Sequence, residues 1–151
     1  MVTEPVPLTE LLVRAGEAVT RFRRRVTAEH GLSGTALGVL ESLARTGGLS
    51  HRELAGTLGV TPATLTPVVD ELERVGEVRR ERDRDDRRIV RVWITDAGAR
   101  RAESAGADVG ETMRAALPEP SSAEAETVRR HLHAVLAAMS DDPTPASRHI
   151  R

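Results

Sequence analysis

The sequence predicts a mainly α-helical protein that carries a small antiparallel β-hairpin. Apolar residues recur at helical spacing over most of the 151 residues. The period changes to alternation of apolar and polar residues in one stretch, residues 78–94. Residues that favour helix starts stand at Ser50, Thr61 and Ser121. We therefore expect six helices, with the hairpin after the fourth.

The first two helices are expected at residues 7–29 and 33–45. Each has leucine, valine and alanine at helical spacing on one face. Gly31 ends the first helix and Gly47 ends the second, because glycine readily adopts the backbone conformation that follows a helix.

A short helix and a longer helix are expected next, separated by a tight turn. Ser50 and Glu53 form a capping box for the short helix, which ends at Leu58. Thr61 caps the longer helix, and Pro62 occupies its first position, where the missing N–H is not needed. This order predicts a helix-turn-helix pair.

The hairpin that follows has a fully charged loop, residues 83–88 (DRDDRR). The loop lacks the Asn-Gly dipeptide of a tight turn, so we expect it to be long, exposed and mobile. Residues 79–91 hold seven Arg and four acids, whereas the whole chain has a net charge of −1. A basic edge on an acidic body orients a protein toward a polyanion. The pair of helices and the basic hairpin predict a winged helix-turn-helix, a DNA-binding fold.

Two further helices are expected at residues 96–117 and 122–139. Thr95 and Asp96 begin the first of them, and Pro118 and Pro120 separate the two. The residues from 140 to 151 are polar and rich in proline, so we expect a disordered tail.

The composition excludes several classes of function. Without cysteine the chain has no disulfide, Cys-ligated metal centre or thiol-based sensor. With one Phe, one Trp and no Tyr it has no aromatic platform for single-stranded nucleic acid. No stretch approaches the roughly 20 apolar residues of a membrane span, and no signal peptide is evident, so we expect a cytoplasmic protein. We find no catalytic constellation or phosphate loop and expect neither enzymatic activity nor a cofactor.

Contacts with double-stranded DNA are expected from the longer helix and from the wing loop. The first turns of a recognition helix need small or hydrogen-bonding side chains to reach base edges, and a wing needs flexible cations to reach phosphates or the minor groove. The residues expected to contact DNA are Thr61, Pro62, Ala63, Thr64, Thr66, Arg84, Arg87 and Arg88. The alternatives are helix capping by the threonines and a solvated charge run in the loop.

The sequence resembles the MarR family of bacterial transcription regulators over nearly its whole length. The motifs that carry the resemblance are Leu54-Ala55 with Leu58-Gly59-Val60, Thr64-Leu65-Thr66 with Val69-Asp70 and Leu72-Glu73, DRDDRR at 83–88, and Ile94-Thr95 with Gly98. By this resemblance Arg88 would enter the minor groove and Asp86 would order the wing.

The resemblance also implies an assembly and a mode of action. We expect an obligate homodimer that binds a pseudo-palindromic operator, and a repressor that a small-molecule effector releases from DNA. The chain would be one domain, residues 1–151, with a winged-helix lobe at 33–95, dimerisation helices at 7–30 and 96–139, and the tail at 140–151. An effector cavity would be lined by Phe22, Val26, Leu37, Leu40, Val109 and Met113, which as an apolar stripe could instead form plain core.

Two residues depart from the family pattern. Pro67 lies inside the expected recognition helix, where it should remove one backbone hydrogen bond and bend the helix. Glu77 stands where the family usually has an apolar residue. The stretch from Thr64 to Pro67 resembles the peroxide-sensing branch, but that branch senses with a cysteine, so peroxide sensing by that route is excluded.

Two other functions stay open. One is an architectural DNA-binding protein without an effector. The other is a metal-responsive regulator with a zinc site that combines His30, His51 or one of His131 and His133 with carboxylates. His131 and His133 are two residues apart on a helix and point to different faces, so they do not form a metal pair, and we expect no metal site.

Overall fold

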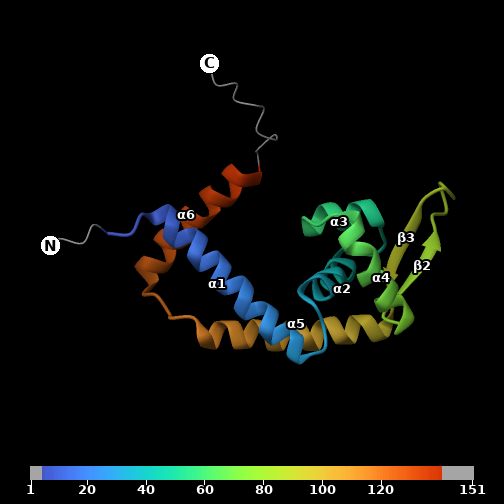
Figure 1. Ribbon diagram of the computed structural model, residues 1–151, viewed down its shortest axis with the longest axis horizontal. Coiled ribbons are helices and arrows are strands. Elements are labelled where there is room, and N and C mark those ends of the chain that lie inside the picture. Colours follow the sequence, from blue (N-terminus) through green and yellow to red (C-terminus); the bar gives the residue numbers. More distant parts are fainter. Residues whose placement is uncertain (1–4, 141–151) are drawn as a thin grey trace, which may run out of the picture. The chain divides into compact units, whose positions relative to one another are not determined.

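The computed structural model describes residues 5–140 and falls into two compact units, which divide between Ala116 and Leu117. The first unit consists of α1 (Leu8–Glu29), α2 (Gly34–Thr46), β1 (Leu49–Ser50), α3 (His51–Leu58), α4 (Pro62–Arg74), β2 (Val78–Arg82), β3 (Val90–Ile94) and α5 (Asp96–Ala116) (Figure 1). The second contains α6 (Ser122–Ser140). The predicted helices and hairpin are thereby confirmed. The predicted tail lies outside the described residues, except for Ser140 at the end of α6.

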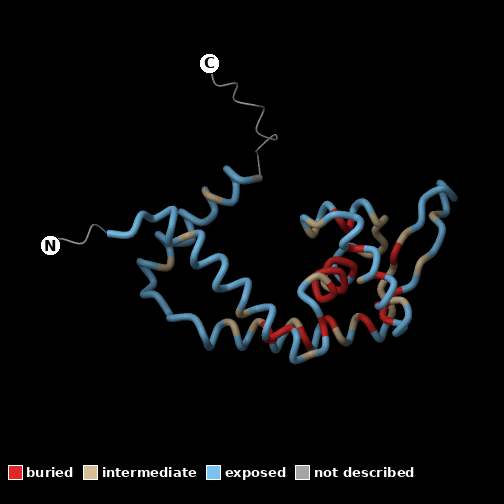
Figure 2. The backbone as a smooth tube through the Cα atoms, viewed as in Figure 1, coloured by how far each residue is buried: buried red, intermediate tan, exposed pale blue. Residues whose placement is uncertain are grey.

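Helix α2 forms the centre of the core in the first unit (Figure 2). It packs against α1, α3, α4 and α5. Its Leu37, Val39, Leu40 and Leu43 are at most 1% exposed. Because this helix is apolar on several faces, it is stabilised by burial on several sides at once.

Capping side chains start the helices where the sequence predicts. The hydroxyl of Ser33 accepts a hydrogen bond from Ala36 N, and Ser50 and Glu53 complete both halves of the capping box. Thr61 caps α4, which continues as an α-helix through Pro67 to Arg74.

The sheet has three antiparallel strands in the order β1-β3-β2. Val78 pairs with Ile94 at the root of the hairpin, and Leu49 of β1 pairs with Val92 of β3. The sequence predicts only the hairpin. It misses β1 because a strand of two residues has no periodicity, and its pairing partner lies more than 40 residues away.

The six residues expected to line an effector cavity lie in or against the core of the first unit. Val26, Leu37, Leu40 and Val109 are buried in one cluster, and Phe22 and Met113 pack against it. The cavities described below are lined by other residues. A role of these six residues in an effector cavity stays a prediction.

Large apolar side chains remain exposed on two helices. In the first unit these are Leu8, Leu11, Val13 and Val19 of α1; in the second they are Val128, Leu132, Leu136 and Met139 of α6. Both helices nevertheless carry many charged residues. None of the helices within residues 5–140 combines the length and the apolar character that crossing a membrane requires.

Candidate nucleic-acid interface

The N-terminus of α4 presents the predicted DNA-contacting residues to solvent. Thr61, Pro62, Ala63, Thr64 and Thr66 are all exposed. The hydroxyl of Thr61 accepts a hydrogen bond from Thr64 N (3.2 Å) and shares another with the Thr64 hydroxyl (2.9 Å). Thr61 therefore caps the helix, and the exposed hydroxyl of Thr64 lies beside the cap. In a recognition helix, this N-terminal end faces the base edges.

A histidine of α3 holds the start of α4 in place. Thr66 Oγ1 donates a hydrogen bond to the Pro62 carbonyl (2.9 Å), and Nε2 of His51 lies 3.1 Å from Thr66 Oγ1 and 3.2 Å from the Pro62 oxygen. Because the Thr66 hydroxyl directs its proton at the Pro62 carbonyl, its oxygen can accept a hydrogen bond from an N–H at Nε2 of His51. This role of His51 could not be foreseen from its place in the sequence.

The arginines of the hairpin fall into two groups. Arg79, Arg80 and Arg91 form ion pairs with carboxylates. Within residues 5–140, the side chains of four others form neither an ion pair nor a hydrogen bond, and all four are exposed: Arg82, Arg84, Arg87 and Arg88. Three of these four are the predicted wing contacts. Cations without an internal partner can bind phosphates without first breaking a bond.

Asp83 orders the wing loop more extensively than Asp86 does. Oδ1 of Asp83 accepts hydrogen bonds from the backbone N–H groups of Asp85 (2.8 Å) and Asp86 (3.1 Å). Asp86 accepts one from Arg88 N (2.9 Å). From the sequence, only Asp86 was expected to order the wing. The loop is exposed, as predicted, but it is held by these bonds rather than left without internal partners.

Arg91 of β3 connects this loop to the helix-turn-helix. Its Nε donates to Asp83 Oδ2, and its Nη1 donates to the Gly48 carbonyl (3.3 Å) and to Glu53 Oε2 (3.2 Å). The hydrogen bond from Arg91, together with those from the loop backbone, lowers the pKa of Asp83 from 3.8 to about 2. Asp83 is therefore ionised at neutral pH and keeps both sets of bonds.

Arg80 connects the wing to the recognition helix. Its Nη1 lies 2.5 Å from Glu73 Oε2 and its Nη2 lies 2.6 Å from Asp70 Oδ1, and both carboxylates belong to α4. The backbone N–H of Arg80 also donates to Glu73 (3.0 Å). The pair of carboxylates thus fixes the spacing between the wing and α4, and this spacing decides whether both can reach one duplex.

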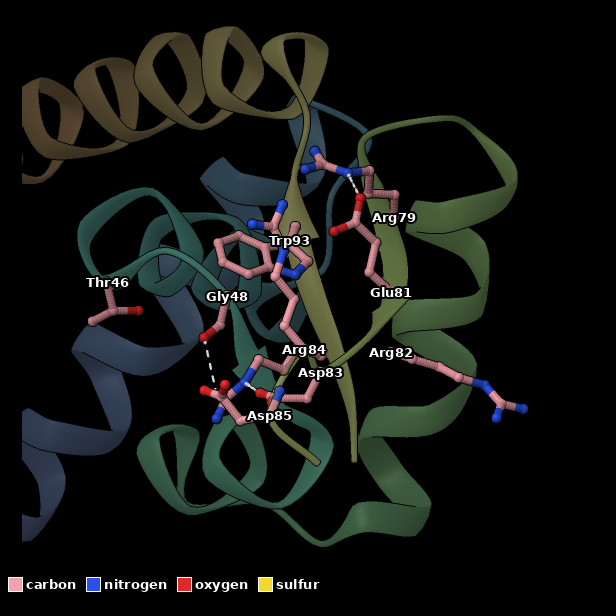
Figure 3. Close-up of a pocket in the computed structure, with 10 residues that line it drawn as sticks. Thr46, Gly48, Arg79, Glu81, Arg82, Asp83, Arg84, Asp85 and Trp93 are labelled. Atoms are coloured by element: carbon pink, nitrogen blue, oxygen red, sulfur yellow. Dashed lines mark hydrogen bonds and ion pairs between the residues drawn. The ribbon is translucent and has the colours of Figure 1, made fainter. Parts of the chain in front are cut away.

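Trp93 lines a cavity of about 630 Å³ on the outer face of the hairpin (Figure 3). The indole packs against Gly48, where a Cβ atom would lie 2.4 Å from the ring. Arg79 pairs with Glu81 across the cavity wall (2.7 Å), and Arg82 extends away from it. Trp93 is half-buried at this place.

The histidines do not form a metal site in the described part of the chain. Among residues 5–140, no three His, Asp or Glu side chains are grouped closely enough to hold a metal ion. His30 lies 3.7 Å from Asp108, and His51 is engaged with α4.

The functional residues that sequence reasoning missed are His51, Arg80, Asp83 and Arg91. One of them carries a local signal. Asp83 stands at the start of a loop with backbone N–H groups two and three residues later, which is the usual position of an Asx turn. Arg80 follows a helix with carboxylates at Asp70 and Glu73, but no spacing rule links a helix to the next strand.

Comparisons with known proteins agree with this geometry. A sequence model described as "MarR family" matches residues 32–90. The HTH-type transcriptional regulator TtmR of Methylorubrum extorquens is 40% identical over 84 residues, which cover 56% of this chain and 43% of TtmR. The chain matches between 43% and 59% of the length of the first three curated relatives.

Solved structures extend the likeness to most of the chain. The apo form of MarR from E. coli has a TM-score of 0.71 at 26% identity and covers 88% of this chain and 99% of its own. CouR from Rhodococcus jostii RHA1, solved with p-coumaroyl-CoA bound, has a TM-score of 0.72 at 29% identity and covers 91% of this chain and 93% of its own. The helices outside the helix-turn-helix are therefore part of the shared fold.

Proposed function

The chain belongs to the MarR family of transcription regulators, and from this membership we propose that it binds double-stranded DNA and regulates transcription. The observation that carries the proposal is a set of four exposed arginines on the wing whose side chains have no partner within residues 5–140: Arg82, Arg84, Arg87 and Arg88. They lie on the same lobe as the exposed N-terminus of α4, which carries small hydroxyl side chains. A DNA duplex offers phosphates to the arginines and base edges to the N-terminus of α4.

In the proposed complex, α4 enters the major groove and the wing reaches the adjacent minor groove. Thr61, Pro62, Ala63 and Thr64 would contact bases or phosphates, and Thr66 would share its hydroxyl between DNA and His51. Arg84, Arg87 and Arg88 would contact phosphates or the narrow minor groove of A·T-rich flanks. Asp86 and Asp83 would keep the wing in the shape that directs these side chains.

We further propose a homodimer on a pseudo-palindromic operator. The exposed apolar side chains of α1 and α6 support this, since a face of leucines and valines is stabilised by burial against a partner. Two copies of α4 would then lie in successive major grooves about 34 Å apart. The protein would act in the bacterial cytoplasm, on nucleoid DNA.

Release from DNA by a small molecule is the proposed mode of control, with repression as the ground state. A cavity of about 530 Å³ supports this, because it lies between α1, the start of α2 and the turn of the helix-turn-helix. Arg23, Arg24, Thr20 and Val60 are among its lining residues. An effector that binds here more tightly in one arrangement of α1 than in another would shift the spacing of the recognition helices.

Selection of bound sequences from a random DNA pool, followed by competition, tests the function. A regulator should prefer its selected operator over random DNA by roughly 10³ or more at a fixed salt concentration. An equal affinity for both would instead support the architectural alternative. A protein that ignores every duplex at low ionic strength would contradict both.

A matched variant isolates the wing in the same assay. Replacing Arg84, Arg87 and Arg88 together by Ala should remove most of the affinity for the operator. Replacing three arginines outside the lobe, Arg114, Arg129 and Arg130, changes the net charge equally and should have a much smaller effect. An equal loss of affinity in the two triple variants would mean that DNA binding depends on net charge alone.

A further inference from the structure

His51, the first residue of α3, contacts two residues of α4 through a single ring nitrogen. Its Nε2 lies 3.2 Å from the carbonyl oxygen of Pro62 and 3.1 Å from Oγ1 of Thr66. Both residues belong to the exposed N-terminal part of α4 that is the candidate DNA-contacting surface. The imidazole of His51 is therefore one hydrogen bond away from that surface.

These two contacts fix the position of the imidazole proton. A carbonyl oxygen only accepts hydrogen bonds, and the Thr66 hydroxyl directs its own proton at the same Pro62 carbonyl (2.9 Å). Nε2 of His51 thus faces two acceptors and carries the N–H. Because a neutral imidazole has a single N–H, Nδ1 of neutral His51 is a bare nitrogen with a lone pair.

Nδ1 of His51 has no partner in the described part of the chain, and it is open to solvent. Within residues 5–140 the ring makes hydrogen bonds through Nε2 alone. The side chain is half-buried. Among the side-chain nitrogens and oxygens of residues 5–140 that are fully buried without a hydrogen bond, Nδ1 does not occur. An outside acceptor can therefore reach this nitrogen.

The charged groups around α3 leave no anion for a protonated His51. Helix α3 packs against α2, α4, β1 and β3. Neither strand contains a carboxylate, and each carboxylate of the three helices is paired with an arginine: Glu41 with Arg23, Glu53 with Arg91, Asp70 and Glu73 with Arg80, and Glu71 with Arg74. The other charges on these elements are the exposed cations Arg45 and Arg52. The anion that could pair with a protonated His51 has to come from outside the lobe.

We propose that His51 binds a DNA phosphate through Nδ1 and takes up a proton as it does so, which makes operator binding depend on pH. The lone pair of a bare Nδ1 repels a phosphate oxygen, whereas a protonated Nδ1 donates a charge-assisted hydrogen bond to it. In a helix-turn-helix the first helix crosses the DNA backbone while the second enters the major groove, so phosphates lie beside α3 in the proposed complex. This coupling rests on the proposed DNA binding.

Protonation adds a contact to DNA without removing one inside the protein. Nε2 keeps its N–H in both charge states, so the bonds to Pro62 and Thr66 persist. Histidine changes charge between about pH 5 and pH 8. Because the complex binds more protons than the free protein, the affinity for DNA should rise as the pH falls through this range.

Nitrogen NMR of the free protein tests the proton position without DNA. At pH 8 we expect Nε2 of His51 to be protonated and Nδ1 to be bare. Comparison with the spectrum of His51→Gln identifies the His51 signals among those of the five histidines. The opposite tautomer would overturn the proposal, since Nδ1 would then carry an N–H without any uptake of a proton.

Operator affinity measured between pH 8 and pH 6 at a fixed salt concentration tests the coupling. We expect the affinity of the unaltered protein to rise at least about threefold over this range. His51→Gln places an amide N–H near the position of Nε2 but does not titrate, so its affinity should match that of the unaltered protein at pH 8 and stay nearly constant. His133→Gln removes a titrating group from α6 and should keep the full rise. The same pH dependence in His51→Gln and the unaltered protein would overturn the assignment.

Calorimetry of operator binding in two buffers with different ionisation enthalpies counts the protons directly and does not require a variant. At pH 7 the unaltered protein should take up protons on binding. Operator binding without proton uptake would contradict this inference and leave the proposed function intact. A protein that binds no duplex at any pH in this range would contradict the proposed function and the coupling together.

Discussion

Asp83 and Arg91 form an ion pair across the base of the wing. Each of the two side chains also makes hydrogen bonds to a further part of the lobe. Asp83 accepts two backbone N–H groups of the loop, and Arg91 donates to Glu53 at the start of α3. The charged loop is thereby joined to the helix-turn-helix through two side chains. The shape of the wing should consequently depend on the ionisation of Asp83.

Acid should release the wing before it unfolds the helices. The pKa of Asp83 is about 2 in the folded protein against an ordinary 3.8, so its contribution to stability is complete above about pH 4 and is lost as the pH falls to about 2. Trp93 lies in the same cavity wall, so its fluorescence should report a transition in this window. Asp83→Asn should lack this transition, and an identical titration curve for the two proteins would contradict the assignment.

One wing arginine should account for about one phosphate contact. We expect Arg88→Ala to weaken operator binding and to reduce the slope of log affinity against log salt by about 0.9. Arg79→Ala changes the net charge equally, but Arg79 is already paired with Glu81, so its slope should change much less. Binding isotherms measured at four salt concentrations distinguish the two. A change in A·T preference without a change in slope would assign Arg88 to the minor groove instead.

The contact between Gly48 and Trp93 should not tolerate a methyl group. In Gly48→Ala the new Cβ would lie within 2.6 Å of three ring atoms, so the indole must move, at a cost of about 1–3 kcal/mol. Gly56→Ala is the matched control because nothing lies within 4 Å of a Cβ there, and within α3 it should stabilise by about 0.5–1 kcal/mol. Urea unfolding measures both, and a similar effect of the two substitutions would rule out the steric explanation.

The cap on the recognition helix should be worth a measurable part of the stability. Thr61→Ala removes the hydroxyl that accepts from Thr64 N and should cost about 1 kcal/mol of unfolding free energy. Thr61→Ser keeps the hydroxyl and should cost much less. Chemical denaturation without DNA measures this effect separately from any DNA contact. If Ser and Ala are equally destabilising, the methyl group and not the cap is responsible.

A charge on the exposed apolar stripe of α1 should weaken the proposed dimer. Leu11 is 48% exposed in the single chain, and burial against a second copy would give it a partner. Leu11→Glu should raise the dissociation constant of the dimer at least tenfold by sedimentation velocity. Glu17→Ala, on the same helix, alters a side chain that already pairs with Arg21 and should have little effect. An unchanged sedimentation profile for Leu11→Glu would place the interface elsewhere.

The positions of the helices could be predicted closely because their signals are local. The capping box of Ser50 and Glu53 acts over three residues, and the hydroxyl of Thr61 reaches Thr64 over the same distance. The exposed threonines and arginines of the candidate interface follow from the same signals, since position in an element fixes which way they face. The expected effector cavity could not be predicted with the same precision. An apolar stripe predicts burial but does not say whether the burial leaves a space.

The order of the elements, the caps and the concentration of arginine in the wing follow from the sequence alone, because each depends on residues within a few positions of one another. Which charges find partners depends on three-dimensional packing. Arg91 meets Glu53 across 38 residues, and Arg101 meets the His30 carbonyl across 71. No pattern along the chain encodes such distances, because they arise when packing of α2 against its neighbours brings distant segments together. For that reason only the folded chain separates the paired arginines from the exposed ones that have no partner within residues 5–140.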